Sequence, residues 1–283
     1  MKYKLLATDM DGTLLTNDKK ISETNINALE AASKKGVEIV IATGRSYSTL
    51  KKYIDLFSFD CYLITNNGAV IRNKVHNVEK SVYLDPEATT EIIKVLSNEN
   101  VYFHSSDADN IYIQSYLARF MEAKRFLQHE YSNPLSLYKS LILKMILDKN
   151  LKKIDFSRIA DQGLPLNTFF ILSEEKLLLN KIKKQLYQIR GVAVTSSSEN
   201  NIEALNDKAS KGAALGYVGD KLGIVKEEMI AVGDQLNDLS MIEYSGLGVA
   251  VANADEKVLK RADWITKSNE DHGVAYVIEY LIK

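Results

Sequence analysis

Short apolar runs alternate with amphipathic segments along the first 70 residues of the chain. The apolar runs have the length of strands and cover residues 5–8, 37–42 and 61–64. Between them, apolar side chains recur with helical spacing over residues 22–35 and 47–54. Because parallel strands need long crossover connections, this alternation of strand and helix predicts a parallel α/β sheet.

The pattern changes after about residue 80, where short two-sided strands are mixed with helices and no series of carboxylates follows the strand ends. We expect helices near residues 86–96, 117–129, 151–160 and 177–189. We expect strands near residues 101–104, 111–114, 141–147, 167–172, 192–195 and 202–205. This α+β pattern predicts a separate domain.

The parallel pattern then returns and continues to the end of the chain. Helices are expected near residues 208–217, 236–244 and 274–282, and strands near residues 229–232, 247–251 and 264–266. The predicted fold is a doubly wound parallel sheet of the Rossmann-like kind. Its core domain is formed by residues 1–80 and 207–283, with an α+β domain of residues 81–206 inserted into it.

The composition is that of a globular protein without a strong global field. The formal net charge of the 283 residues is −1, which gives no general attraction to nucleic acid or to membranes. No apolar run approaches the ~20 residues of a membrane span. The single cysteine, Cys61, fits a reducing compartment. We therefore expect a cytoplasmic protein that is a monomer or a weak homodimer and binds neither nucleic acid nor membranes.

Carboxylates follow two of the expected parallel strands. Asp9 and Asp11 come directly after the first strand, and Asp234 comes after the strand at residues 229–232, with Asp238 one helical turn further on. Aspartate is also an ordinary turn residue, so a structural role is the simpler reading of either pair alone. In open parallel sheets, however, ligands bind beyond the carboxyl ends of the strands.

Four carboxylates gathered at one edge repel one another unless a cation lies between them. Carboxylate oxygens together with water and phosphate suit Mg²⁺. No histidine or cysteine belongs to this set, which speaks against zinc.

Other strand ends carry groups that suit a phosphate. Thr43 supplies a hydroxyl donor after the second strand, and Gly44 lets backbone N–H groups approach an anion. Asn67 follows the third strand, and Lys211 lies near the start of the helix that re-enters the core. Phosphoryl transfer needs positioning and charge neutralisation above all, and this set supplies both.

These motifs resemble those of the haloacid dehalogenase-like (HAD) phosphatases, and more narrowly the Cof-type subgroup with an α+β cap of subclass IIB. The residues that carry the resemblance are Asp9-Met10-Asp11-Gly12-Thr13, Thr43, Lys211 and Gly233-Asp234-x-x-Asn237-Asp238. Four further segments match the subgroup: Asn67-Gly68-Ala69, Ser210-Lys211-Gly212, Gly246-x-Gly248-Val249-Ala250 and Asn269-Glu270-Asp271-x-Gly273-Val274.

The resemblance implies a role for each carboxylate. Asp9 is expected to be the nucleophile that forms an aspartyl-phosphate. Asp11 is expected to protonate the leaving alcohol and then to activate water, which requires a pKa raised by neighbouring negative charge. Magnesium is expected at the Asp9 carboxylate, the Asp11 backbone carbonyl and Asp234. Asp238 is expected to act through a metal-bound water or by orienting Lys211.

The resemblance also implies a set of groups that hold the phosphoryl moiety, with Asn67 in support. They are the Met10 backbone, Thr43, Gly44, Lys211 and Asn237. Lys208 competes with Lys211 for the lysine position, and the Ser-Lys-Gly context favours Lys211. Arg45 follows the phosphate loop and is a further candidate contact to the substrate or the inserted domain.

The expected function is hydrolysis of small phosphorylated metabolites, with sugar phosphates as the leading class. One alternative is a phosphomutase or another phosphotransferase of the same superfamily, which would pass the phosphoryl group to an acceptor other than water. The other is a non-enzymatic phospho-acceptor or sensor module. Receiver domains place their acceptor after a later strand and lack a large insert, whereas this chain has its Asp-x-Asp after the first strand.

Overall fold

The computed structural model describes residues 2–127, 148–159 and 163–281, which form two compact units. The first, the core unit, consists of Met1–Val82, Thr195–Ser198 and Asp207–Lys283. The second, the insert unit, consists of Tyr83–Val194 and Glu199–Asn206.

The core unit is built on an eight-stranded sheet with the strand order β14-β13-β12-β1-β2-β3-β4-β5. Its parallel part is formed by β1 (Leu5–Thr8), β2 (Glu38–Ala42), β3 (Tyr62–Thr65), β12 (Met229–Gly233), β13 (Leu247–Ala250) and β14 (Trp264–Ile265). β1 lies between β2 and β12, so strands from the N-terminal and C-terminal parts of the chain are neighbours in the middle of the sheet. The predicted parallel α/β sheet is confirmed.

Two further strands at one edge were not expected from the sequence. β4 (Val70–Arg72) and β5 (Val78–Ser81) pair antiparallel with β3 and with each other. β5 is largely solvated, and β4 has only three residues, so neither shows a period long enough to indicate a strand.

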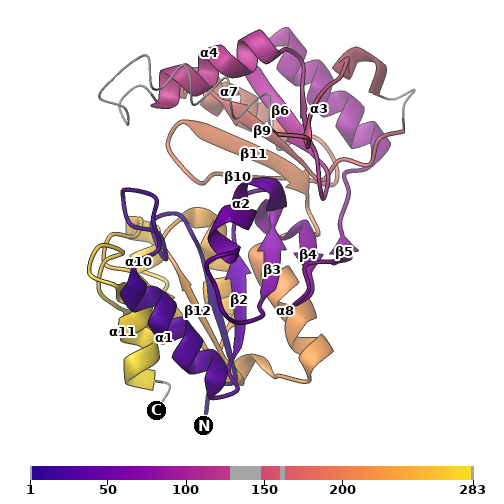
Figure 1. Ribbon diagram of the computed structural model, residues 1–283. Helices are drawn as coiled ribbons and strands as arrows, with labels where there is room; N and C mark the ends of the chain where they lie inside the picture. The colour runs from indigo at the N-terminus through magenta and orange to yellow at the C-terminus, as the bar shows by residue number, and fades with distance from the viewer. Residues whose placement is uncertain (1, 128–147, 160–162, 282–283) are drawn as a thin grey trace. The chain divides into compact units, whose positions relative to one another are not determined.

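Helices cover both faces of the core sheet (Figure 1). On one face, α1 (Glu23–Lys34), α2 (Tyr47–Ile54) and α11 (Gly273–Leu281) share an apolar cluster with side chains such as Leu6 and Ile39. On the other face, α8 (Lys211–Leu222) and α9 (Leu239–Tyr244) pack against side chains such as Leu5 and Val40. Neighbouring strand residues thus point to opposite layers, and the strands are buried on both sides. A short helix, α10 (Glu256–Leu259), precedes β14.

The start of α8 was predicted three residues too early, at Lys208. The helix begins at Lys211 because Ser210 caps it, and the Ser210 hydroxyl accepts a hydrogen bond from the Ala213 backbone N–H. Lys211 therefore lies in the first turn of α8, whereas Lys208 is an exposed residue before the cap.

The insert unit has its own six-stranded sheet with the strand order β10-β11-β9-β6-β7-β8. Its strands are β6 (Tyr102–Ser106), β7 (Ile111–Ile113), β8 (Leu151–Lys153), β9 (Thr168–Leu172), β10 (Val192–Thr195) and β11 (Asn201–Asn206). Helices α3 (Pro86–Asn98) and α7 (Lys176–Leu186) share an apolar cluster with this sheet, and α4 (Tyr116–Leu127) follows β7.

One predicted helix of the insert unit is wrong. Residues 151–160 begin with β8, which pairs with β7, and continue as a short 3₁₀ turn at Phe156–Arg158. The Asp155 side chain accepts the Ser157 backbone N–H, which favours a local turn over a continuous helix. The strand predicted at residues 141–147 and the end of the helix predicted at 117–129 lie outside the described residues.

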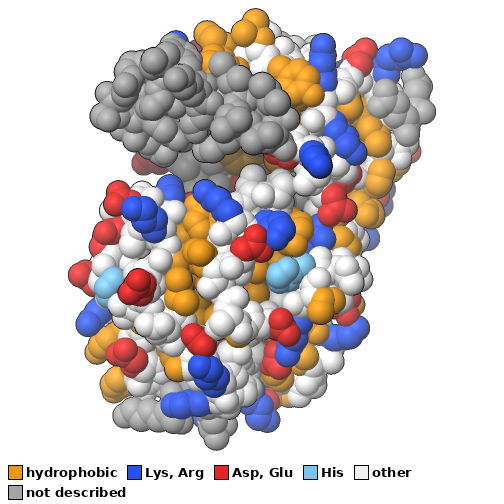
Figure 2. Space-filling model, in the orientation of Figure 1, with side chains coloured by type: hydrophobic (Ala, Val, Ile, Leu, Met, Phe, Trp, Pro, Cys, Tyr) orange, Lys and Arg blue, Asp and Glu red, His pale blue; other side chains and the backbone are white. Residues whose placement is uncertain are grey.

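The surface carries charges of both signs. On the face that Figure 2 shows, basic and acidic side chains are interspersed, in keeping with the net charge of −1. Within the described ranges, no helix has the length and apolar character that crossing a membrane requires.

Candidate active site

Three carboxylates meet at the carboxyl ends of β1 and β12. Asp9, Asp234 and Asp238 are buried, and each offers a carboxylate oxygen within 4.8 Å of the others. Asp9 and Asp234 directly follow their strands, and because β1 and β12 are neighbours in register, these residues are brought side by side. The distance between them permits a shared cation.

Lys211 lies against two of these carboxylates. Its Nζ is 2.6 Å from Asp9 Oδ1 and 2.5 Å from Asp238 Oδ1, and the side chain is fully buried. Burial lowers the pKa of Lys211, but the charges of Asp238 and Asp9 outweigh burial and hold this pKa above its ordinary value. Lys211 is therefore an ammonium group placed beside Asp9, a position that the exposed Lys208 does not occupy.

Asp238 organises the loop that follows β12. Its Oδ2 accepts the backbone N–H groups of Asp234 and Gln235, each at 2.9 Å, while its Oδ1 contacts Lys211. A Cβ on Gly233 would lie 2.5 Å from the Cβ of Asp238, so a side chain there would displace it. The spacing of the Gly-Asp-x-x-Asn-Asp motif thus places one aspartate in the cluster and uses the other to hold both the loop and the lysine.

The cluster holds more negative charge than Lys211 compensates. Burial raises the pKa of Asp9 well above its ordinary value, and the charges of Asp238 and Asp234 add to this against the opposing effect of Lys211. Burial and the charge of Asp238 raise the pKa of Asp234 to about 7, although Thr13 donates a hydrogen bond to its Oδ1 at 2.8 Å. A set of oxygen donors with excess negative charge fits a hard divalent cation such as Mg²⁺.

The raised pKa of Asp234 gives a prediction about stability. The folded protein binds this proton more tightly than the unfolded chain does, so this group makes the folded state lose stability as the pH rises from about 4 to about 7. We expect Asp234→Asn, which keeps an acceptor for Thr13, to raise the melting temperature at pH 7.5 by about 5 °C. Thermal unfolding in EDTA at pH 7.5 and pH 5 measures this. A gain that is equal at both pH values would contradict the explanation.

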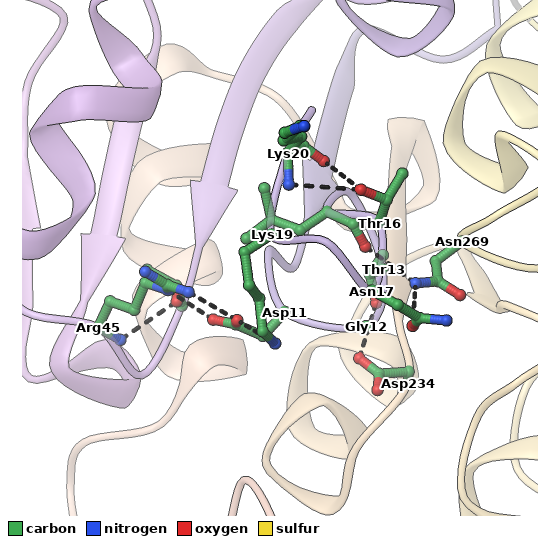
Figure 3. A network of polar contacts seen from close by, with 12 residues as sticks. Asp11, Gly12, Thr13, Thr16, Asn17, Lys19, Lys20, Arg45, Asp234 and Asn269 are labelled. Atoms are coloured by element: carbon green, nitrogen blue, oxygen red, sulfur yellow. Dashed lines mark hydrogen bonds and ion pairs between the residues drawn. The ribbon is translucent and has the colours of Figure 1, made fainter. Parts of the chain in front are cut away.

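Asp11 faces away from this cluster and toward two cations (Figure 3). Arg45 contacts both carboxylate oxygens, with its Nε at 2.6 Å and an Nη at 2.7 Å, and Lys19 Nζ lies at 3.1 Å. Burial raises the pKa of Asp11, but the hydrogen bonds and charge of Arg45, supported by Lys19, lower it to about 2. The expected upward shift is therefore wrong for this arrangement, because the carboxylate faces a guanidinium instead of the other acids.

No pattern in the sequence marks Lys19 as a partner of Asp11. This residue adopts a left-handed backbone conformation, with φ of 56°, in the turn that follows the first motif. The Tyr53 hydroxyl donates to its carbonyl oxygen at 3.2 Å. The hydrogen bond from Tyr53, a residue of another element, helps to hold Lys19 where it contacts Asp11. Arg45, in contrast, could be proposed from the sequence because it directly follows Thr43 and Gly44.

The candidate phosphate groups are buried and linked to one another. Thr43 is 1% exposed and follows β2, and its Oγ1 accepts the Arg45 backbone N–H at 3.2 Å. Asn237 Nδ2 donates to Asn67 Oδ1 at 2.9 Å, which joins the ends of β3 and β12. Asn237 Oδ1 is buried without a hydrogen-bond partner. Gly44 lies against Asn67, because a Cβ there would be 3.1 Å from Asn67 Oδ1.

The first motif makes a tight approach to Asp234. Gly12 has φ of +80°, and a Cβ on it would lie 2.4 Å from Asp234 Oδ2, so only glycine fits. Met10 is fully buried in the apolar cluster beneath, and its carbonyl oxygen accepts the backbone N–H groups of Leu14 and Leu15. The position of the turn is therefore held by the packing of Met10 in the apolar cluster and by the close contact of Gly12 with Asp234.

Comparison with known proteins agrees with this arrangement. Residues 6–278 match the family model of the haloacid dehalogenase-like hydrolases. The chain is 32% identical to phosphatase YwpJ of Bacillus subtilis (strain 168), over 99% of this chain and 100% of that protein. It is 30% identical to the 5-amino-6-(5-phospho-D-ribitylamino)uracil phosphatase YcsE of the same organism, over 99% and 96% of the two chains. The solved structure of a haloacid dehalogenase-like hydrolase from B. subtilis superposes with a TM-score of 0.85 at 32% identity, covering 98% and 99% of the two chains.

Proposed function

This chain belongs to the haloacid dehalogenase-like hydrolases, as a phosphoric monoester hydrolase, and on that premise we propose that it is a Mg²⁺-dependent phosphatase that works through an aspartyl-phosphate on Asp9. The observation that carries the proposal is the placement of Asp9. It is a buried carboxylate in contact with an ammonium group and within 4.8 Å of two further acids.

In the first step, an oxygen of Asp9 attacks phosphorus, and the bond between phosphorus and the ester oxygen breaks. Lys211 stabilises the negative charge on the transferred group. The leaving oxygen takes a proton from Asp11, which requires that the contact between Asp11 and Arg45 be broken first. In the second step, water attacks phosphorus, its proton passes to Asp11, and Asp9 is released with inorganic phosphate.

The carboxylates of Asp9 and Asp234 would hold the cation, with that of Asp238 adjoining. The backbone carbonyl of Asp11, two residues after Asp9, would be a further ligand. When bound, the cation would supply positive charge against the non-bridging oxygens of the phosphoryl group. The Met10 backbone, Thr43, Gly44 and Asn237 would hold the same oxygens, and the unpartnered Oδ1 of Asn237 is compatible with a further donor arriving with the substrate.

We propose small phosphorylated metabolites as substrates, with phosphorylated sugars and sugar alcohols as the leading class. Two observations support this. One relative is named for a substrate with a phosphorylated ribityl group. The chain also has a second compact unit, residues 83–194 and 199–206, which does not contain the candidate catalytic residues. We assign substrate selection to that unit. A cytoplasmic location, and a monomer or weak homodimer, complete the proposal.

Chelation provides the first test of the metal. We expect EDTA to abolish hydrolysis of p-nitrophenyl phosphate and added Mg²⁺ to restore it, because the buried acids around Asp9 otherwise repel the phosphoryl group. The measurement is the release of nitrophenolate across a Mg²⁺ titration after chelator removal. Full activity in EDTA would contradict the metal assignment.

The substrate is tested by screening phosphorylated metabolites with Mg²⁺ and quantifying free phosphate against consumed substrate. Equal amounts support hydrolysis. A deficit that appears as a new phosphate ester would identify a phosphotransferase, and stable labelling of Asp9 by acetyl phosphate without turnover would identify a phospho-acceptor module.

A further inference from the structure

The loop that carries Asp11 is held by asparagine side chains from the other end of the chain. We call residues 9–17 the catalytic loop. Asn253 Nδ2 donates to the Gly12 carbonyl oxygen at 2.8 Å, and Asn269 Nδ2 donates to the Leu15 carbonyl oxygen at 2.9 Å. Both contacts satisfy backbone acceptors of a segment that is not part of a regular strand, apart from isolated bridges at Asp11 and Leu15.

The two asparagines are coupled to each other. The Asn269 backbone N–H donates to Asn253 Oδ1 at 2.9 Å, so the side-chain amide of Asn253 is fixed at both ends. Asn269 is 3% exposed, and its Nδ2 also reaches Asn17 Oδ1 at 3.3 Å. The amide plane of Asn253 is therefore oriented by a buried anchor, although Asn253 itself is exposed.

The segment around Asn253 is also bound to the loop that carries Asp234. The Val251 N–H donates to the Gly233 carbonyl oxygen at 3.2 Å, and the Asp255 N–H donates to the Asp234 carbonyl oxygen at 2.8 Å. One short segment thus contacts the backbone of Asp234 on one side and that of Gly12 on the other. It sets the spacing between two parts of the site that are more than 200 residues apart in sequence.

This spacing has little tolerance. Gly12 already lies so close to Asp234 that a Cβ would come within 2.4 Å of its Oδ2. The Asp11 and Gly12 carbonyls belong to successive peptide units joined at the Gly12 Cα, so we expect a shift of the Gly12 carbonyl to displace the Asp11 carbonyl as well. Even a small displacement of this carbonyl weakens cation binding, because metal ligands must be held within a fraction of an ångström of their ideal positions.

We propose that Asn253 is a positioning residue, which sets the distance between the catalytic loop and Asp234 through its hydrogen bond to the Gly12 carbonyl. The inference rests on the proposed function, because it assigns the consequence to cation binding by Asp234 and the Asp11 carbonyl. Asn253 touches neither the substrate nor the cation in this role, and Asn269 acts only by orienting it.

A matched control is available on the same loop. The Glu270 carboxylate accepts the Asn17 backbone N–H at 2.5 Å, and both Glu270 and Asn253 are exposed. Glu270→Ala therefore removes one side-chain contact to the loop backbone, as Asn253→Ala does, but at the end remote from Gly12. A contribution that is merely structural would make the two variants alike.

The experiment compares Asn253→Ala, Asn253→Asp and Glu270→Ala with the unmodified protein. For both Asn253 variants we expect kcat to fall about tenfold, the Mg²⁺ concentration for half-maximal activity to rise about tenfold, and the substrate KM at saturating Mg²⁺ to stay unchanged. Asn253→Asp keeps the acceptor for the Asn269 N–H and replaces the donor to Gly12 with a carboxylate oxygen. Because this variant also adds a negative charge, the uncharged Asn253→Ala must show the same loss for the effect to be assigned to the contact with Gly12. Glu270→Ala should keep kcat and the Mg²⁺ requirement.

A second readout is independent of turnover. The rise in melting temperature on adding Mg²⁺ should be smaller for both Asn253 variants than for Glu270→Ala. The proposal is overturned if Asn253→Ala and Glu270→Ala change kcat and the Mg²⁺ response equally. If the unmodified protein hydrolyses phosphate esters in EDTA, it is the proposed function that fails, and this outcome is recognised without any Asn253 variant.

Discussion

Asp9→Asn lowers the rate of phosphate ester hydrolysis by at least about 10⁴-fold, the largest effect that we expect from any single substitution in this chain. The amide oxygen of asparagine is too weak a nucleophile to form the covalent intermediate. The substitution is nearly isosteric and removes one of three mutually repelling carboxylates, whose burial already raises the pKa of Asp9. Lys211 keeps its second partner, Asp238, so the fold should persist.

Turnover with excess substrate and Mg²⁺ measures the loss, and circular dichroism with thermal unfolding measures the fold. Asp18→Asn serves as the matched control, because Asp18 is an exposed residue in the turn after the same motif and should keep full activity. If Asp9→Asn retains most of the activity, the nucleophile has been misassigned. Rapid acid quenching during turnover adds a direct test, since the unmodified protein should retain protein-bound phosphate and the variant should not.

Lys211→Met combines a large loss of activity with a large loss of stability. It leaves Asp9 and Asp238 buried without their shared counter-charge, and breaking a buried ion pair in this way costs about 3–5 kcal/mol. We expect the free energy of unfolding at pH 7.5 to fall by about that amount, as measured by urea denaturation in EDTA. Hydrolysis should become undetectable, because the transferred phosphoryl group loses its ammonium partner.

Two comparisons identify the cause of the destabilisation. Lys211→Met combined with Asp238→Asn should recover part of the lost stability, because one of the unpaired charges is removed as well. Lowering the pH should also narrow the difference in stability from the unmodified protein. Burial already raises the pKa of Asp9, and without Lys211 the folded variant binds this proton more tightly still than the unfolded chain does. Lys208→Met, at an exposed position, should change neither property. A Lys211→Met protein as stable as the unmodified one would refute the buried pair.

The residues at strand ends could be predicted because their placement follows from local pattern and sheet topology. Asp9 ends β1 and Asp234 ends β12, and two adjacent parallel strands necessarily bring such residues together. The start of α8 is harder to predict from the sequence. Apolar periodicity alone does not locate the first turn of a helix, so it predicts a start at Lys208, whereas the capping hydroxyl of Ser210 sets the start at Lys211.

The partners of Asp11 could not be predicted, because they are set by side-chain direction. The sequence spacing of Asp9 and Asp11 shows that the two residues are close, but it does not show which way the Asp11 side chain points. Only the structure shows that the Asp11 carboxylate contacts Arg45 and Lys19. The contact between Asn253 and Gly12 spans 241 positions of the sequence and leaves no periodic signal. In the insert unit, the false helix at 151–160 arose where pairing of β8 with β7 overrides weak local preference.

The central position of β1 also determines when the core sheet can be completed during synthesis. Its neighbour β12 is synthesised more than 200 residues later, whereas every residue of the insert unit precedes Asp207. During translation the insert unit is complete while β1, β2 and β3 still present an unpaired strand edge, the kind of surface that chaperones shield. Asp9 and Asp234, which follow β1 and β12, therefore meet only in the last stage of folding, so we expect a chain truncated before β12 to lack phosphatase activity.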